Sequence, residues 1–462
     1  MTNKESKVDR RTFLSSAAIV GASGALGAGG LLTACSDRGS DRLTPLRPVS
    51  EYNVVHELPD KAIDGKPIKA VLIGCGARGT GAAINFLEAG DGLSVVALAD
   101  VFQDKIDICR NELKEKRSNV VTEDRCFVGF DAYIKACKLP EVDMAIIASP
   151  SIFHPEQTRY AIEQGKHVFV EKPACIDAVG YRAFMTAVRQ AQSRGLCVVT
   201  GTQRHHQRGY IESYKKVQEG YIGRIVSGNV YWNQASHAFV RRQPGWTDME
   251  YMIRDFFGWN WLCGDHIIDQ GVHNIDVFTW FSHLKPTFVI GMGSRLRRIA
   301  GNIYDNFSAD IEYEGGVHLH AMARQIDNCH SRVAEIIHGT KGSWSNLQDE
   351  FIIRDLDGNI VWKWNKEAND EQYKQNNPYV LEHVDLVNHI RKGTVVNFAE
   401  TTAISSFTGA MARESAYTGR AYEWDESVNS DMNLMPEELH LGNVPDFATK
   451  FVSPLPGTSL SW

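Results

Sequence analysis

The 462-residue sequence lacks several features that would place it in particular functional classes. It has no basic excess, because 49 Lys and Arg face 56 Asp and Glu for a net charge of −7, and this argues against a nucleic-acid partner. It has no internal repeat and no long low-complexity tract. Beyond residue 35, no apolar run reaches the roughly 18 residues that a membrane-spanning helix needs.

The nine cysteines show no paired spacing. The eight beyond Cys35 form no CxxC motif, and several fall inside expected strands or helices. In an oxidising compartment they could form disulfides. We favour buried free thiols that pack as small apolar residues, which suits a chain that folds in the reducing cytoplasm before export.

The first 35 residues resemble an export signal. Arg10 and Arg11 precede a weakly apolar run rich in Gly and Ala, as in a twin-arginine signal. The residues 32–35 resemble a bacterial lipobox in which Cys35 would carry a lipid anchor; a cleaved signal or a short membrane anchor are the alternatives. We therefore expect a polar tether over 36–66 and a periplasmic protein, or a lipoprotein that faces the periplasm or the cell surface.

A dinucleotide-binding loop follows the tether. Residues 68–73 predict a short strand, G-x-G-x-x-G follows at Gly74, Gly76 and Gly79, and a helix is expected over 79–89. Such glycines permit a tight turn and let the backbone approach a pyrophosphate at the helix N-terminus. The next expected strand, 93–99, ends at Asp100, whose carboxylate would accept the ribose hydroxyls and repel a 2′-phosphate. The pattern predicts NAD rather than NADP.

Strands and helices continue to alternate as far as residue 200, which predicts a parallel, doubly wound sheet. Further strands are expected over 143–149, 167–170 and 196–200, and ligands of such sheets bind at the carboxyl ends of the strands. The residues that fall at such ends are Ser149, Pro150, Glu171, Lys172, Gln203 and Arg204.

Several motifs resemble one family of enzymes. "VEKPA", "GTQRHHQ" and "GDHIIDQGVHNID" are similar to motifs of the Gfo/Idh/MocA (glucose–fructose oxidoreductase / inositol dehydrogenase) family, and the resemblance covers about residue 67 to 462. It implies an α/β protein with an NAD-binding Rossmann domain over 67–202. An α/β domain with a large open, mostly antiparallel sheet would follow over 203–427, with cofactor and sugar meeting between the two. A C-terminal arm over 428–462 would be of the kind that wraps a partner subunit in a homo-oligomer.

Alternating apolar and polar residues indicate the strands of the second domain. We expect helices over 380–392 and 401–418, packed back toward the cleft. The expected strands are 288–296, 307–323, 332–338, 350–354 and 360–364.

The resemblance assigns catalysis to Lys172, Asp269 and His273. Asp269, His273 and Asp276 are spaced i, i+4 and i+7, so they would share one face of a helix. A Lys, an Asp and a His at a nicotinamide suit alcohol oxidation, because one group removes the hydroxyl proton while the others hold the developing alkoxide. Lys172 could instead be a surface residue and His273 a core histidine. Asp265, His266, Asp269 and His273 could in principle bind a metal, but the resemblance implies catalysis without one.

Two sets of binding residues complete the prediction. Cofactor-binding residues are Gly74, Gly76, Ala77, Arg78, Gly79, Asp100, Ser149, Pro150, His154, Glu171, Lys172 and Gln203. Substrate-binding residues are Arg204, Trp259, Trp261, Asp269 and His273. The tryptophans belong to an aromatic segment, residues 241–261, which suits sugar stacking, packing between sheet and helices, or a subunit interface.

Three functions remain open at this stage. The first is a redox-neutral carbohydrate enzyme that holds NAD tightly beneath a covering segment and cleaves glycosides or exchanges hydride between sugars. Exported relatives include glycosidases of glycoside hydrolase family 109, although "GDHIIDQGVHNID" keeps the dehydrogenase-like Asp/His pattern. The second is a net NAD-dependent sugar, glucoside or inositol-type dehydrogenase. The third is a non-catalytic, surface-anchored sugar-binding protein, which the retained Lys, Asp and His argue against.

Overall fold

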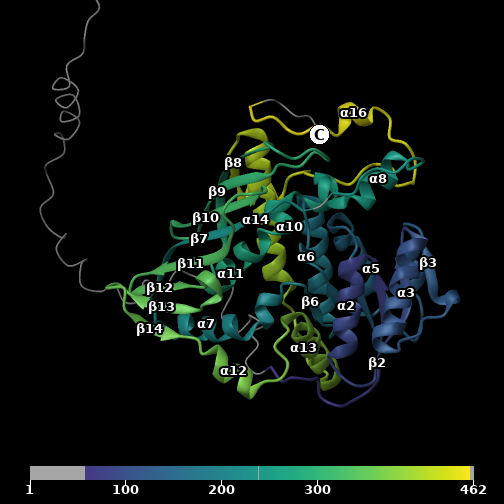
Figure 1. The fold of residues 1–462 in the computed structure, drawn as a ribbon, viewed down its shortest axis with the longest axis horizontal. Helices are drawn as coiled ribbons and strands as arrows, with labels where there is room; N and C mark the ends of the chain where they lie inside the picture. Colours follow the sequence, from purple (N-terminus) through teal and green to yellow (C-terminus); the bar gives the residue numbers. More distant parts are fainter. Residues whose placement is uncertain (1–57, 238, 458–462) are drawn as a thin grey trace, which may run out of the picture. The chain divides into compact units, whose positions relative to one another are not determined.

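The computed structural model describes residues 58–237 and 239–457, and these residues carry two sheets (Figure 1). The expected export signal, Cys35 and the tether up to residue 57 lie outside the described residues. Among the described helices, none combines the length and the apolar character that crossing a bilayer requires.

The first sheet has six parallel strands in the order β3-β2-β1-β4-β5-β6, so the prediction of a Rossmann fold is confirmed. The strand β3 was not predicted, because three residues give no readable periodicity. The strands are β1 (Ile68–Ile73), β2 (Leu93–Asp100), β3 (Cys126–Val128), β4 (Met144–Ile147), β5 (His167–Val170) and β6 (Val198–Thr200). The helices and short 3₁₀ turns between them are α2 (Ala77–Glu88), α3 (Gln103–Arg117), η2 (Glu123–Arg125), α4 (Ala132–Cys137), η3 (Ser151–Phe153), α5 (His154–Glu163) and α6 (Ala178–Ser193).

The second sheet has nine strands in the order β14-β13-β12-β11-β7-β10-β9-β8-β15. All neighbours are antiparallel except β7 and β10, which confirms a large, mostly antiparallel sheet. The single strand expected over 307–323 is wrong: it is a hairpin, turned at Gly315 and Gly316, which both have positive φ angles. The strands are β7 (Ile225–Gln234), β8 (Pro286–Ser294), β9 (Asn306–Tyr313), β10 (Val317–Gln325), β11 (Arg332–Gly339), β12 (Gly342–Ser345), β13 (Ile352–Asp355), β14 (Ile360–Lys363) and β15 (Tyr422–Glu423).

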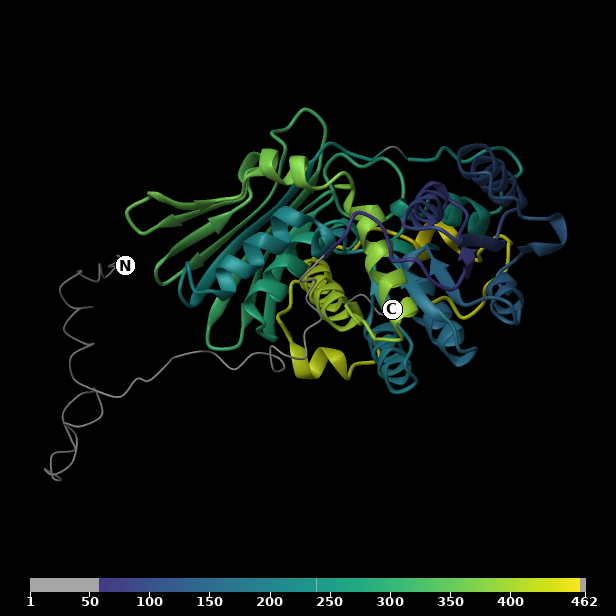
Figure 2. The ribbon, with the colours of Figure 1, turned by 90° about the horizontal axis from the view of Figure 1, so that it is seen from below.

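Helices cover one face of this sheet. The helices α10 (His266–Asp269) and α11 (Val272–Ser282) pack against its central strands, and α14 (Ala399–Thr418) packs against β8 and β9 and lies between the sheet and α6 (Figure 1). Figure 2 shows the strands fanning out at the left of the view, with the first domain at the right. The helices and 3₁₀ turns of this part are η4 (Gln203–His206), α7 (Arg208–Gln218), α8 (Asp248–Arg254), η5 (Phe256–Gly258), α9 (Asn260–Cys263), α10 (His266–Asp269), α11 (Val272–Ser282), η6 (Leu347–Asp349), α12 (Lys366–Gln372), α13 (Pro378–Lys392), α14 (Ala399–Thr418), α15 (Trp424–Val428) and α16 (Phe447–Lys450).

The C-terminal arm, described as far as residue 457, packs on its own chain. The Leu434 amide donates to Asp177 Oδ2 at 2.8 Å, and the Val444 amide donates to Asp248 Oδ2 at 2.9 Å. Phe447 and Phe451 of the arm pack against the ring of Trp259. An arm of the kind expected to wrap a partner therefore has intramolecular anchors on α6, α8 and the aromatic segment.

Candidate active site

The glycine loop has the geometry that a dinucleotide requires. Gly74 has a φ of +91°, and a Cβ there would lie 2.5 Å from the Ser149 amide nitrogen. A Cβ on Gly79 would lie 1.8 Å from the Gly74 carbonyl oxygen, so only glycine lets α2 approach β1 this closely. A Cβ on Gly76 would meet nothing within 4 Å, which leaves the N-terminus of α2 open to an approaching phosphate group.

A groove of about 300 Å³ runs from this loop along the strand ends. Gly74, Gly76, Ala77, Ser149 and Pro150 line it, in agreement with their expected positions, as does Asp100. The two Asp100 side-chain oxygens accept hydrogen bonds from the amides of Cys75, at 2.6 Å, and Phe102, at 2.9 Å. The carboxylate is thereby fixed at the end of β2, where ribose hydroxyls would lie in a Rossmann domain.

The opposite wall of the groove comes from outside the first domain. Ile253 and Arg254 of α8, Phe256, and Met435 and Leu439 of the C-terminal arm line it. Arg254 also spans the groove, because its guanidinium forms a pair of 3.0 Å hydrogen bonds with the Asp104 carboxylate of α3. The groove is therefore bounded by segments that are more than 150 residues apart in sequence from the glycine loop, and the arm is one of them.

A second cavity of about 270 Å³ adjoins the groove and contains Lys172, Asp269 and His273. Lys172 follows the end of β5, and its Nζ donates to the Asp269 carbonyl oxygen at 2.6 Å and lies 3.5 Å from Asp269 Oδ1. The Lys172 side chain is 17% exposed, so this ion pair is shielded but still reachable from the cavity. The structure thus places together all three residues assigned to catalysis.

His273 is buried and electrically neutral. Burial lowers its pKa well below the usual value, and the neighbouring Lys172, Arg204 and Arg78 lower it further. Its ring stacks on Trp232 at 5.3 Å, and its buried Nδ1 has no hydrogen-bond partner among the described residues. A neutral imidazole can accept a proton from a substrate hydroxyl, whereas an imidazolium cannot.

The single helical face expected for Asp269, His273 and Asp276 is wrong. The helix breaks at Gln270 and Gly271, so Asp269 ends α10 and His273 lies in the first turn of α11. Asp276 points away from the cavity and lies 2.6 Å from His205 Nε2 in the core. The break matters, because it lets the main-chain carbonyl of Asp269 face Lys172 instead of continuing a helical ladder.

Arg78 lies in the catalytic cavity and does not line the dinucleotide groove. Its Nε donates to Glu171 Oε1 at 2.6 Å, and its guanidinium lies 4.7 Å from the ring centre of Tyr379. Glu382, on α13 behind Arg78, is fully buried; burial and the neighbouring Glu171 raise its pKa well above the usual value. Arg78 and Glu171, both expected to bind the cofactor, line the cavity that holds Lys172, and their contact with the cofactor stays a prediction.

The expected substrate contacts of Arg204, Trp259 and Trp261 are not supported by their positions. Arg204 is buried and forms an ion pair with Glu335. Trp259 is 4% exposed among the arm's phenylalanines, and Trp261, 3% exposed, donates from Nε1 to the sulfur of Met252. All three lie outside the cavity lining. The packing alternative therefore holds for this part of the aromatic segment.

The aromatic side chains that do line the cavity are Trp232, Phe256, Phe257 and Tyr379. Trp232 projects from β7 and Tyr379 from α13, and neither belongs to a motif near Lys172 or Asp269. Sequence reasoning missed them because β7 and α13 reach the cavity only through the tertiary fold. The Phe256–Phe257 pair was within the segment expected to contain sugar-stacking residues.

The two remaining cofactor candidates differ in position. Both His154 ring nitrogens lie 2.8 Å from backbone carbonyl oxygens, those of Pro173 and Ser149, so the ring ties the ends of β4 and β5. Gln203 lines neither cavity, and its buried Oε1 has no hydrogen-bond partner in the described part of the chain.

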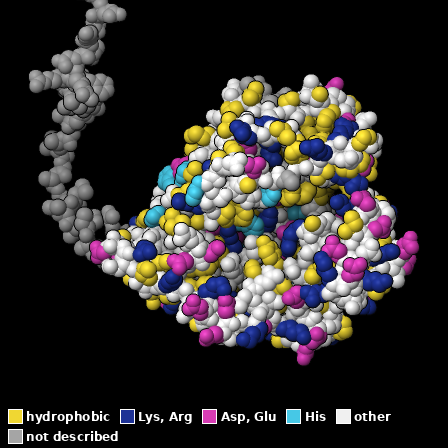
Figure 3. All heavy atoms as spheres, viewed as in Figure 1, with side chains coloured by type: hydrophobic (Ala, Val, Ile, Leu, Met, Phe, Trp, Pro, Cys, Tyr) yellow, Lys and Arg dark blue, Asp and Glu magenta, His cyan; other side chains and the backbone are white. Residues whose placement is uncertain are grey.

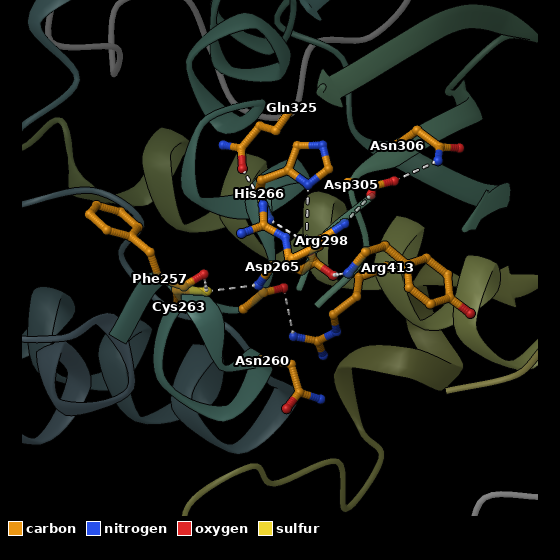
Figure 4. A network of polar contacts seen from close by, with 12 residues as sticks. Phe257, Asn260, Cys263, Asp265, His266, Arg298, Asp305, Asn306, Gln325 and Arg413 are labelled. Carbon is orange, nitrogen blue, oxygen red and sulfur yellow. Dashed lines mark hydrogen bonds and ion pairs between the residues drawn. The ribbon is translucent and has the colours of Figure 1, made fainter. Parts of the chain in front are cut away.

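A buried polar network fixes the loop before α10 (Figure 4). Asp265 accepts hydrogen bonds from the Tyr417 hydroxyl at 2.5 Å and the Tyr304 amide at 2.8 Å. Arg413 of α14 donates to the carbonyl oxygens of Ile176, at 2.9 Å, and Gly264, at 3.3 Å. It therefore joins the loop that follows Lys172 to the loop that precedes Asp269.

Asp265 and His266 belong to this network, and the described residues contain no group of three or more His, Cys, Asp or Glu arranged to hold a metal ion.

The eight described cysteines are unpaired thiols, of which Cys126 is half-buried, Cys329 exposed and the other six buried. Figure 3 shows basic and histidine side chains together in a hollow near the centre of the face in view, while acidic and basic side chains alternate over the rest of that face.

Comparison with known proteins agrees with this architecture. Residues 68–202 match the domain described as "Oxidoreductase family, NAD-binding Rossmann fold", and residues 210–345 match "GFO/IDH/MocA C-terminal domain". A 1,5-anhydro-D-fructose reductase of Ensifer adhaerens is 26% identical over 213 residues, which cover 44% of this chain and 56% of the relative. A glycosyl hydrolase family 109 protein of Phocaeicola vulgatus is 28% identical over 134 residues, 29% of this chain and 25% of the relative.

The match thus spans about half of the reductase and about a quarter of the glycosidase. Among solved structures, scyllo-inositol dehydrogenase from Lactobacillus casei with bound NAD(H) and scyllo-inositol superposes with a TM-score of 0.57 at 22% identity. The superposition covers 79% of this chain and all of that one, and it shows a shared fold.

The fold is that of the NAD-binding Rossmann domain of an oxidoreductase family, joined to an open-sheet domain. The chain belongs to the Gfo/Idh/MocA family, as its sequence motifs suggested.

Proposed function

We propose that this protein is a redox-neutral carbohydrate enzyme that keeps its NAD throughout the catalytic cycle. The observation that supports the proposal is the second wall of the dinucleotide groove: Met435 and Leu439 of the C-terminal arm line the same groove as Gly76 and Asp100. In the proposal, the arm is the segment that covers the bound cofactor. A cofactor bounded on both sides dissociates slowly, because the arm must move before it can leave.

The residues of the cavity suit the oxidation of a sugar hydroxyl. Neutral His273 accepts the hydroxyl proton, and the Lys172 ammonium, held by Asp269, stabilises the negative charge that develops on the oxygen. Trp232 and Tyr379 supply flat apolar faces for a sugar ring. When bound, NAD would take up a hydride from the ring carbon and later return it.

A ketone on the sugar ring makes glycoside cleavage possible. The ketone acidifies the adjacent C–H, so loss of that proton can expel the aglycone as an alcohol. Water then adds to the resulting double bond, and reduction of the ketone restores the hydroxyl. The net reaction consumes glycoside and water and releases sugar and alcohol, with no external oxidant. Hydride exchange between two sugars would also leave the cofactor in its starting state.

The proposed export of the protein fits a redox-neutral cycle. A twin-arginine signal exports folded chains, so NAD could be loaded in the cytoplasm and carried to the periplasm, with Cys35 as a lipid anchor. Outside the cytoplasm no soluble pool would replace or reoxidise the cofactor. Retention and redox neutrality are then linked requirements.

The substrate class rests on the relatives. Their names include a 1,5-anhydro-D-fructose reductase, a glycosyl hydrolase family 109 protein and a scyllo-inositol dehydrogenase, all of which suggest a sugar or polyol. The test uses extensively dialysed protein and a panel of 4-nitrophenyl glycosides with no added NAD. Release of nitrophenol over many turnovers supports the proposal, and turnover only with stoichiometric NAD contradicts it.

A net sugar or inositol-type dehydrogenase is the second candidate. The same Lys172, Asp269 and His273 would serve it, and the dehydrogenase-like run "GDHIIDQGVHNID" favours it. The two functions differ in one readout. A dehydrogenase accumulates free reduced nicotinamide in proportion to its ketone product. In the redox-neutral enzyme, the concentration of reduced nicotinamide reaches a steady level that does not exceed the enzyme concentration.

We also propose a homo-oligomer in which two copies of the chain associate through the open face of the nine-stranded sheet. Side chains alternate along its strands, and apolar ones stand exposed on the face opposite α11 and α14. They are Ile290, Met292 and Met322, with exposed fractions of 50%, 72% and 37%. Light scattering of wild type against Met292→Lys tests the pairing, and an unchanged mass contradicts it.

A further inference from the structure

A third cavity, of about 330 Å³, lies beside the catalytic one. It is formed by the ends of β7 and β10, the turn at 255–258 and the loop after β8. Phe257 lines both cavities. Gln270 Nε2 lies 2.5 Å from Nε2 of His237, a residue of the third cavity, and Gln270 also lines the catalytic cavity. The Phe257 ring and the hydrogen bond between His237 and Gln270 thus lie at the boundary of the two cavities.

The polar groups of the third cavity have mixed charge. Arg297 and Arg298 supply donors, while Asp255 and Asp327 supply acceptors, and Gln325 offers both. The four charges balance, so the cavity does not select a strongly anionic or cationic ligand. A balanced set of donors and acceptors beside a flat aromatic ring is suited to a neutral ligand with many hydroxyls.

Two buried polar atoms of this cavity have no partner among the described residues. The Asp255 side chain is 3% exposed, and its Oδ1 accepts a hydrogen bond from the Val240 amide at 2.7 Å, but its Oδ2 has none. Burial raises the pKa of Asp255 to about 6. Arg298 Nε is likewise buried and unpartnered. Unpaired buried groups are costly, and both atoms belong to residues that line the cavity, so these side chains keep unused hydrogen-bonding capacity beside it.

The cavity wall is held in place independently of any ligand. Arg298 donates from Nη2 to Gln325 Oε1 at 2.5 Å, and its amide donates to Asp305 at 3.0 Å (Figure 4). Phe257 is stacked on the His237 ring at 5.3 Å with an interplanar angle of 10°. Such preorganised side chains lose little entropy when a ligand binds.

We propose that this cavity is a second carbohydrate subsite, which binds the ring next to the one oxidised in the catalytic cavity. The substrate class is then a neutral glycoside of at least two sugar rings, with Phe257 between them. The inference rests on the proposed function, because it assumes that the first ring is a sugar placed beside Lys172.

The experiment compares two substrates that share the oxidised sugar: its methyl glycoside and a disaccharide in which a second hexose replaces the methyl group. Wild type is expected to show at least about tenfold higher kcat/KM for the disaccharide, as one or two hydrogen bonds to charged groups would give. Arg297→Ala and Asp255→Asn should reduce that preference toward one and leave kcat/KM for the methyl glycoside unchanged. Arg420→Ala, an exposed arginine outside all three cavities, is the matched control.

Equal kcat/KM values for the two substrates in wild type, or equal losses for both in the variants, would overturn the subsite. The proposed function fails separately, if neither glycoside is turned over by dialysed protein. In that case calorimetric titration of the disaccharides into wild type and Arg297→Ala decides the subsite alone. Binding that is absent, or unaffected by Arg297→Ala, overturns it. A melting curve of each variant confirms that Asp255→Asn is folded.

Discussion

Lys172 Nζ lies 2.6 Å from the main-chain carbonyl oxygen of Asp269, closer than its 3.5 Å to the Asp269 carboxylate. The contact is possible because the helix breaks after Asp269 and frees that carbonyl. The hydrogen bond holds the Lys172 ammonium at the junction of the two domains, between the end of β5 and the end of α10. The position of the catalytic cation therefore depends on both the backbone and the side chain of residue 269.

Replacement of Lys172 by Ala should lower kcat by about 10²–10⁴-fold, because the developing alkoxide loses its cation. Folding and NAD content should stay near those of wild type, since Lys172 does not line the dinucleotide groove. Turnover and the nucleotide released on denaturation are both measured. Lys135→Ala, an exposed lysine of α4, is the control. Near-normal turnover in the Lys172 variant would remove it from the mechanism.

Asp100 should determine the choice of NAD over NADP. Its carboxylate is fixed by two backbone amides at the end of β2, and a 2′-phosphate there would meet a like charge. Asp100→Ser should therefore raise the proportion of NADP that co-purifies, measured by chromatography of the nucleotide released on denaturation. Wild-type protein that releases mostly NADP would show that another residue controls the choice.

The arm should set the lifetime of bound cofactor. Met435→Ser and Leu439→Ser remove apolar side chains from the groove wall and should accelerate NAD release at least several-fold, measured as nucleotide lost over time in dialysis. Leu441→Ser is a matched control, since Leu441 belongs to the same arm, is 44% exposed and does not line the groove. Equal release rates in all three variants and wild type would show that the arm does not retain the cofactor.

The pH dependence of kcat/KM should report His273. Because burial and nearby cations lower its pKa, the acid limb should lie below the ordinary histidine range near 6.5. Stability should fall with pH in the same direction as activity. The unfolded chain binds this proton at a higher pH than the folded chain, so His273 reduces the free energy of unfolding as the pH falls below about 6.5. His273→Gln should flatten the acid limb of activity and lessen the acid loss of melting temperature. An acid limb at or above pH 6.5 in wild type contradicts the assignment.

Much of the fold could be predicted because its signals are local. One short stretch of sequence contains the glycine loop, its flanking strands and Asp100. The strand ends that carry Ser149 and Lys172 belong to the same alternation of strands and helices. The positions of Trp232, Tyr379 and Glu382 could not be predicted, since β7 and α13 reach the cavity only through packing.

Two errors have different physical origins. The spacing of Asp269, His273 and Asp276 fits one helix, but the helix breaks at Gln270 and Gly271, where a Cβ on Gly271 would lie 2.4 Å from the Ile267 carbonyl oxygen. Trp259 and Trp261 resemble sugar-stacking residues in sequence, but the arm that covers Trp259 lies almost 200 residues later. Residue spacing does not reveal a local break of the first kind, and composition does not reveal a long-range contact of the second kind.

The most direct test of the account is multiple turnover by the protein's own NAD. Purified enzyme is dialysed until the buffer holds no nucleotide, and it is then given a large molar excess of a cleavable glycoside while product and absorbance of reduced nicotinamide are followed together. The account predicts many product molecules for each bound NAD, with the absorbance levelling off below the enzyme concentration. A single burst that stops at one product per enzyme and resumes only when NAD is added would contradict it.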